Sequence, residues 1–277
     1  METTLLDKDM IAQPELWRMM LSVTDRTIDV ALYPPTAREE LVWRSFELDG
    51  SAPSRLKAIE DVVYDNPLLL SDFKSVGCVV DCGLRAPVPA EAGEVCAARV
   101  LAEMWSDELP DDAEVELYDT GCSDARIALV IDPELRAFLT RTFFNIRFVE
   151  RKAALCRYFA SHPEGISPAR VYGIFNRDVV TVIAMNGDRL LMANDFRYRT
   201  AYDAAYYLLA SMRSLGLDAA STDVVLHGRP EGEERVEPVI RRFVNRVRAI
   251  PFPMLRYRVS KSTLQAPFDL LICTQCE

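Results

Sequence analysis

Two stretches of this chain share one order of predicted elements, and this repeat constrains the fold more than any other feature. In the first half, short β-rich runs separated by turn residues predict an antiparallel meander. Apolar residues at a spacing of three and four then predict a helix. The predicted elements are strands at 16–23, 27–33 and 41–47, a helix at 54–64 and a strand at 76–80. Their order is βββαβ.

The same order returns in the second half. Asn186-Gly187 predicts a two-residue hairpin turn, and Thr200 with Asp203 three residues later has the spacing of a helix capping box. The predicted elements are strands at 171–176, 179–185, 189–196 and 223–227 and helices at 200–216 and 236–247. The order βββαβα predicts an α/β protein of two similar lobes, each with such a unit on a mixed sheet.

Further elements link the two halves. They are predicted as a helix over 90–105, an acidic loop, a hairpin about 119–124, a helix over 133–142, a strand at 145–149 and a helix over 150–161. The turn residues His162-Pro163-Glu164-Gly165 predict a hinge. We expect an N-terminal lobe of residues 1–162, with the inserted hairpin and connecting helices, and a C-terminal lobe of residues 163–277.

Composition narrows the classes of function. The 277 residues are 49% hydrophobic and 27% charged, which is typical of a globular protein. No signal peptide is expected, and no apolar run is long enough for a membrane span, so we expect a cytoplasmic protein. A net charge of −10 argues against general binding to nucleic acids. Seven cysteines, an odd number, favour reduced thiols over a disulfide framework.

Three segments resemble a known family. They are IDPELRAFLTRTFFN (131–145), LLMANDFRYRTAYDAAYYLLASMRSLGLD (190–218) and the terminal APFDLLICTQCE. They are similar to a bacterial family, domain-of-unknown-function family 3822, whose fold is described as actin-like. The resemblance implies an actin-like ATPase, or ribonuclease-H-like, fold over nearly the whole chain. It implies no reaction, ligand or partner.

The resemblance raises a nucleotide hypothesis that the residues at the two first hairpins do not favour. Active actin-like proteins place Asp-x-Gly-x-Thr/Ser there, because glycine lets backbone N–H groups approach a phosphate. This chain has Thr24-Asp25-Arg26-Thr27 and Asn176-Arg177-Asp178, both without glycine. Actin-like proteins also end a late strand in two paired glycines. At the corresponding place this chain has only Gly228. The residues expected to line a nucleotide cleft are Asp25, Arg26, Arg177, Asp178, His227 and Gly228.

Two short motifs resemble functional sites but are better interpreted as structural. Asp119-Thr120-Gly121-Cys122-Ser123 fits a phosphate turn or half of an aspartic protease site, but its position favours an ordinary β-turn. Cys273-x-x-Cys276 follows an apolar, strand-like run at 268–272 and lacks further zinc ligands, so structural cysteines are favoured. We therefore expect no metal, no cofactor and no catalytic residue.

An arginine cluster near the end of the last predicted helix leaves two alternatives open. Its members are Arg241, Arg242, Arg246 and Arg248. They fit a solvated helix face with cations near its C-terminus, or a docking patch for an acidic partner or a phosphate group. Tyr202 and Tyr206, one helical turn apart, fit either packing against the sheet or an exposed interface.

The leading hypothesis is a catalytically inactive actin-like module for binding or assembly, which recruits a protein or peptide partner. Scaffold members of the superfamily recruit a short peptide between lobes, and this is an analogy of fold only. The alternative is an unorthodox nucleotide-binding ATPase that uses the interlobe cleft. Nuclease chemistry ranks last, because it needs several carboxylates converging on two metal ions.

Overall fold

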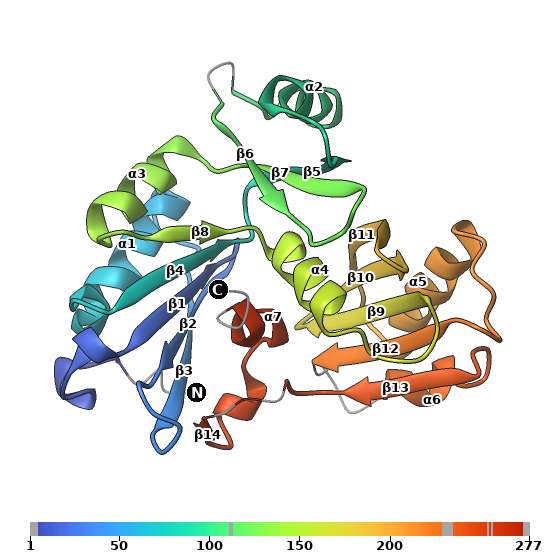
Figure 1. Ribbon diagram of the computed structural model, residues 1–277. Coiled ribbons are helices and arrows are strands. Elements are labelled where there is room, and N and C mark those ends of the chain that lie inside the picture. The colour runs from blue at the N-terminus through green and yellow to red at the C-terminus, as the bar shows by residue number, and fades with distance from the viewer. Residues whose placement is uncertain (1–4, 111–112, 229–234, 254, 256, 274–277) are drawn as a thin grey trace.

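The computed structural model describes residues 5–110, 113–228, 235–253, 255 and 257–273. Two large sheets and a smaller one make up its β-structure (Figure 1). The first large sheet defines the first lobe. Its strands, in spatial order, are β14 (Arg258–Val259), β3 (Glu40–Glu47), β2 (Thr27–Tyr33), β1 (Arg18–Val23), β4 (Ser75–Val80) and β8 (Arg147–Val149).

The second large sheet defines the second lobe and repeats this topology. Its spatial order is β11 (Arg189–Arg197), β10 (Val179–Asn186), β9 (Ala169–Asn176), β12 (Asp223–Gly228) and β13 (Arg246–Ile250). In both sheets the first strand of the unit pairs antiparallel with the second and parallel with the fourth. The predicted repeat of element order is therefore confirmed as a repeat of topology. The short β14 pairs with β3, so the end of the described chain returns to the first lobe.

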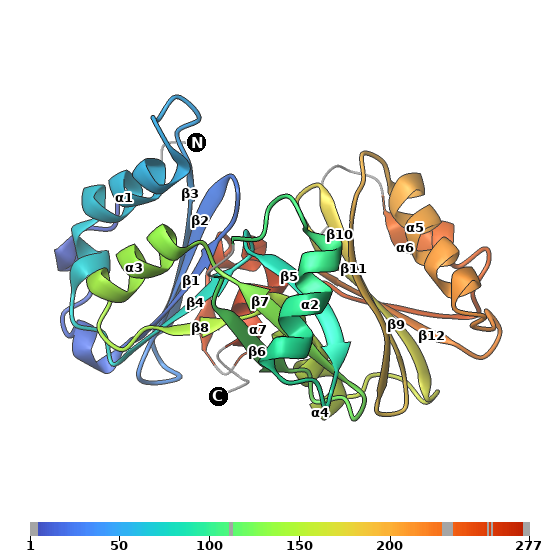
Figure 2. The same ribbon diagram turned by 90° about the horizontal axis from the view of Figure 1, so that it is seen from above.

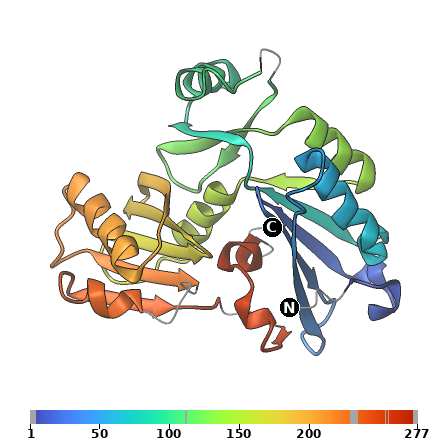
Figure 3. The same ribbon diagram turned by 180° about the vertical axis from the view of Figure 1, so that it is seen from behind.

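Helices cover both sheets. In the first lobe, α1 (Arg55–Asp65) and α3 (Pro133–Thr142) pack on the outer face. In the second lobe, α5 (Ala201–Ser214) and α6 (Val236–Ile240) do the same. The remaining pair, α4 (Arg151–Ser161) and α7 (Phe268–Ile272), lies between the two sheets and packs against each of them (Figure 3).

An insert follows β4 and has its own small core. It consists of β5 (Leu84–Pro89), α2 (Glu94–Met104), β6 (Val115–Asp119) and β7 (Ala125–Val130). Seen from above, the insert lies over the junction between the lobes (Figure 2). Short 3₁₀ helices complete the description at Lys8–Met10, Pro14–Leu16, Pro67–Leu70 and Thr263–Gln265. No helix in the described ranges is long and apolar enough to cross a membrane.

The structure corrects several predicted elements. The helix predicted over 236–247 ends at Ile240, and residues 246–250 form strand β13. The run at 268–272 is helix α7 and not a strand, because a short run buried on all sides has no periodicity that separates the two. The helix predicted from 90 begins at Glu94, and β5 before it was not predicted. The hairpin turn predicted at Asn186-Gly187 consists of Gly187 and Asp188.

Candidate functional site

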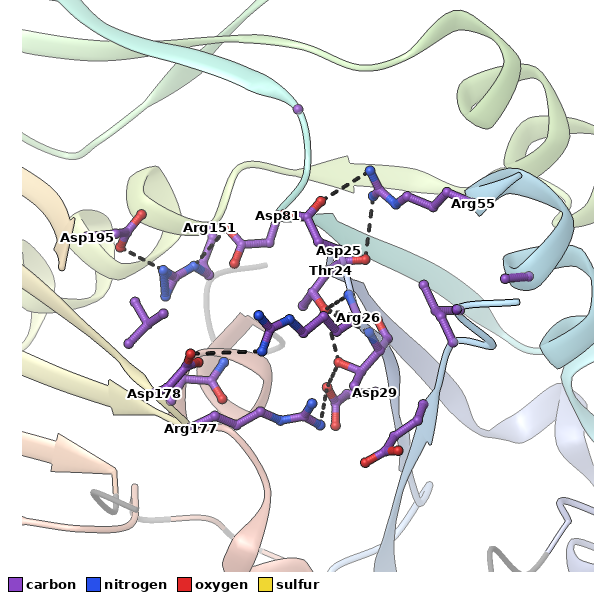
Figure 4. A pocket seen from close by; sticks show the side chains of 18 of the residues that line it. Thr24, Asp25, Arg26, Asp29, Arg55, Asp81, Arg151, Arg177, Asp178 and Asp195 are labelled. Atoms are coloured by element: carbon purple, nitrogen blue, oxygen red, sulfur yellow. Dashed lines mark hydrogen bonds and ion pairs between the residues drawn. The ribbon is translucent and has the colours of Figure 1, made fainter. Parts of the chain in front are cut away.

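A cleft of about 1050 Å³ separates the two lobes, and both first hairpins line it (Figure 4). The β1–β2 turn provides Asp25 and Arg26 from the first lobe, and the β9–β10 turn provides Arg177 and Asp178 from the second. These four residues were predicted for the cleft from sequence, and the fold brings them together.

Two arginines cross this cleft in opposite directions. Arg26 reaches from the first lobe toward the second, where its Nη1 lies 4.0 Å from Asp178 Oδ2. Arg177 reaches from the second lobe to the first, where its Nη2 donates to Ser45 Oγ at 2.8 Å and lies 3.7 Å from Asp29 Oδ2. These five residues are called the cross-lobe clasp. Guanidinium groups therefore lie between the two hairpin turns (Figure 4).

The backbone of the first turn is occupied by its own side chain. The hydroxyl of Thr24 accepts hydrogen bonds from the N–H groups of Arg26 at 3.2 Å and Thr27 at 2.9 Å. The Thr24 N–H in turn donates to the Thr27 carbonyl at 3.0 Å. A phosphate cradle needs unpaired N–H groups that point at the anion. In this turn the N–H groups of Thr24, Arg26 and Thr27 are satisfied internally.

The second turn has a residue in the left-handed region of backbone conformation. Arg177 has a φ of +52°, where side chains other than those of glycine, asparagine and aspartate are uncommon. The Tyr198 hydroxyl donates to the Arg177 carbonyl at 2.5 Å and holds this conformation. A strained residue persists only where its surroundings fix it. Here the strained backbone directs the Arg177 side chain across the cleft.

Asp29, the first-lobe partner of Arg177, is a buried carboxyl in the middle of β2. It is 2% exposed, and its Oδ2 also accepts from the Thr27 hydroxyl at 3.2 Å. Burial raises the pKa of Asp29, and the nearby Arg177 only partly opposes this. Loss of Arg177 would leave this carboxyl with less compensation for its burial.

A buried arginine, Arg151 at the start of α4, joins the two lobes at the floor of the cleft. Its Nε lies 3.1 Å from Asp81 Oδ1 of the first lobe. Its Nη2 lies 2.8 Å from Asp195 Oδ1 and donates to the Thr181 hydroxyl, both in the second lobe. Its Nη1 lies 3.3 Å from Asp269 Oδ2 of α7. One guanidinium thus holds three parts of the chain together.

Charge at this junction sets the pKa values of the carboxyl groups around it. Burial acts to raise the pKa of Asp195, but Arg151 and Lys152 outweigh burial and hold this pKa well below its usual range. Burial dominates at Asp269 and raises its pKa despite Arg151. None of these charged groups belongs to a sequence motif, so sequence reasoning missed them. Charged residues at the ends of apolar strands, such as Asp81, were the available signal.

The other two residues predicted for the nucleotide cleft do not line it. His227 is fully buried in a cage of aromatic rings, 4.3 Å from Phe268 between centroids, and its Nε2 lies 3.1 Å from Glu164 Oε2. Gly228 has a φ of +75°, and a Cβ there would lie 2.3 Å from the Phe175 carbonyl oxygen. This glycine therefore serves the close approach of β12 to β9. It lines a smaller cavity that shares Asp29, Asn176 and Arg177 with the cleft.

Of the remaining motifs, the one at residues 119–123 is explained by the structure. Asp119 accepts from the Gly121 N–H at 3.1 Å and Gly121 has a φ of +71°, which confirms a turn between β6 and β7. The predicted Cys273–Cys276 pair lies partly outside the described residues. Within the described ranges, no group of three or more His, Cys, Asp or Glu side chains could hold a metal ion.

The four arginines of the predicted cluster are exposed. Arg241 and Arg242 follow α6, and Arg246 and Arg248 lie on β13.

Comparison with known proteins identifies the family of this chain and structures with a similar fold. The sequence model of a family described as protein of unknown function (DUF3822) matches residues 7–247. The chain belongs to the DUF3822 family. No curated protein matches this DUF3822 protein in sequence.

Solved structures similar to this DUF3822 protein agree on the fold. A Bacteroides thetaiotaomicron protein with an actin-like ATPase fold and unknown function has a TM-score of 0.75 at 17% identity, covering 96% of this chain and 98% of its own. A structure of the PilM–PilN type IV pilus biogenesis complex has a TM-score of 0.55 at 12% identity, covering 95% of this chain and 98% of that chain. The DUF3822 protein therefore has the actin-like ATPase fold predicted from its sequence.

Proposed function

We propose that this DUF3822 protein is a catalytically inactive actin-like module that recruits a protein or peptide partner into its interlobe cleft. The observation that carries the proposal is the cross-lobe clasp. Arg26 and Arg177 lie where an actin-like ATPase needs room for phosphate groups, and each is matched to a carboxylate of the opposite lobe. A nucleotide would have to displace both contacts.

The satisfied first turn supports the same proposal. Without glycine, and with the N–H groups of Arg26 and Thr27 bonded to Thr24, the turn has fewer backbone donors to offer a phosphate. Positioning and electrostatic stabilisation of the transferred phosphoryl group by preorganised donors are the main source of catalysis in phosphoryl transfer. At the first hairpin of this chain, these two backbone donors are already bonded within the turn.

The cleft is better suited to binding a polypeptide segment than to hydrolysing ATP. The cleft is large, at about 1050 Å³, and polar and charged side chains from both lobes and from the insert line it. A structural neighbour solved as part of a PilM–PilN complex supports a protein partner by analogy of fold. We also propose that the module works in the cytoplasm and that its lobes divide at residue 162, with β14 returning to the sheet of the first lobe.

Site-specific photo-crosslinking tests this proposal. A photoreactive benzoylphenylalanine replaces Glu47, which is exposed and lines the cleft, in the full chain in its own cells. The matched control replaces Tyr64, which is exposed on the outer helix α1. One discrete polypeptide cross-linked from position 47 and not from 64 is expected. No product specific to position 47, or metal-dependent ATP turnover lost on substitution of Asp25, contradicts the proposal.

A further inference from the structure

One segment of the second lobe, from the end of α6 into β13, is strongly basic. Residues 241–248 carry four arginines and no acidic residue, although the whole chain has a net charge of −10. Arg241 pairs with Glu237 at 2.6 Å, whereas Arg242 and Arg248 have no ion-pair partner within the described ranges. Phe243 lies among them and is 60% exposed. The four arginines and Phe243 are called the basic end.

The surface of the insert has the opposite character. Residues 91–108, which include α2, carry five acidic side chains and a single basic one, Arg99. All five acidic side chains are exposed: Glu91, Glu94, Glu103, Asp107 and Glu108. Two apolar side chains lie among them, Val95 at 80% and Met104 at 55% exposure. These seven residues are called the acidic end.

The two ends lie on opposite sides of the molecule. In Figure 1, α2 is at the top of the view, and α6 and β13 are at the lower right. The ends of one molecule therefore cannot meet, but those of two molecules can. We propose that the chain associates head to tail, with the acidic end of one copy on the basic end of the next. Such a heterologous contact repeats and produces an open chain of copies or a closed ring.

Each end supplies both kinds of complementarity that a protein interface uses. Opposite charges orient the two surfaces and exclude the wrong pairing of like ends. The apolar side chains supply the part that is removed from water, with Val95 and Met104 on one side and Phe243 on the other. Because the charges are exposed, the attraction is screened by salt. This inference does not rest on the proposed function, since the interlobe cleft takes no part in it.

Sedimentation velocity of the full chain tests the inference. At about 0.05 M NaCl the average mass is expected to rise with protein concentration, and at about 0.5 M, where screening is short-ranged, it is expected to fall toward that of the monomer. A monomer at every concentration in low salt overturns the proposal. So does association that is unchanged by salt.

Two charge-reversal variants separate head-to-tail association from other kinds. One carries Arg242→Glu and Arg248→Glu, and the other carries Glu94→Arg and Glu103→Arg. Each variant alone is expected to be monomeric, because each has lost one end. Their mixture is expected to associate again, because the intact acidic end of the first variant fits the intact basic end of the second. A mixture that stays monomeric, or single variants that associate like the wild type, overturns the proposal.

A matched control guards against an effect of net charge alone. Lys8→Glu with Arg38→Glu makes the same change in charge as the arginine variant, at exposed positions of the first lobe that belong to neither end. This variant is expected to associate like the wild type. Loss of association in this control would show that net charge, and not the two ends, governs it. Circular dichroism of each variant establishes that it is folded.

Discussion

Removal of Arg177 isolates the contribution of the cross-lobe clasp to stability. Loss of one partner of a fully buried ion pair costs about 3–5 kcal/mol, while an exposed pair contributes about 0–1 kcal/mol. Asp29 is 2% exposed, but the Arg177 side chain is 38% exposed and 3.7 Å away. Solvent screening at Arg177 therefore places the expected cost of Arg177→Ala between these limits, at about 1–2 kcal/mol.

The pH dependence of this cost identifies Asp29 as its source. Burial raises the pKa of Asp29 in the folded state. A group with a raised folded pKa contributes stability at low pH that is lost as pH rises through that pKa. Without Arg177 the pKa of Asp29 rises further, so Arg177→Ala should cost more at about pH 8 than at about pH 4, because protonation of Asp29 at lower pH removes the charge that Arg177 compensates.

Urea unfolding of a double-mutant cycle measures the coupling directly. Wild type, Arg177→Ala, Asp29→Asn and the double variant are compared at both pH values. In the Asp29→Asn background, Arg177→Ala should cost little, because no buried charge is left unpaired. The surface pair Arg189–Asp124, with Arg189 67% exposed, serves as the control and should couple by less than about 1 kcal/mol. A coupling between Arg177 and Asp29 no larger than this control would refute the reasoning.

Three further substitutions have separate outcomes. Thr200→Ala removes the capping box of α5 and should lower the free energy of unfolding by about 1 kcal/mol, measured by urea titration. Arg151→Met leaves its three buried or half-buried aspartate partners without their shared cation, and should cost about 3–5 kcal/mol in the same titration. Gly228→Ala places a Cβ against a carbonyl at a positive φ, and should cost more than about 1 kcal/mol by thermal melting. A stability equal to that of the wild type would contradict the corresponding account in each case.

Local signals in the sequence predicted most of the fold. The capping box at Thr200 and the turn-separated strands of both meanders depend on neighbouring residues, and the structure confirms them. The sequence prediction assigned the wrong element where tertiary packing, and not the local sequence, determines the secondary structure. Residues 246–250 form a strand because β12 provides an open edge, and residues 268–272 form a helix buried between the lobes.

The candidate site was predictable only in part. The four turn residues followed from the resemblance to actin-like proteins, which place their phosphate turns at the first hairpin of each lobe. The clasp did not, because the contact of Arg26 with Asp178 joins positions far apart in sequence and exists only when the lobes dock. Asp29 appeared as a polar interruption of an apolar strand, and nothing nearby in sequence identified Arg177 as its partner. The Arg151 junction likewise draws its partners from three elements.

A thermal-shift measurement of the full chain with ATP, ADP or GTP and magnesium tests the central claim most directly. A ligand at about a hundred times its dissociation constant stabilises the folded state by roughly 2.7 kcal/mol, which is readily seen as a raised melting temperature. Because guanidinium groups lie between the two hairpin turns and the N–H groups of Arg26 and Thr27 are already bonded to Thr24, we predict no shift at about millimolar nucleotide. A clear rise with ATP, abolished by substitution of Asp25 or Asp178, would contradict the account and establish a nucleotide site in the cleft.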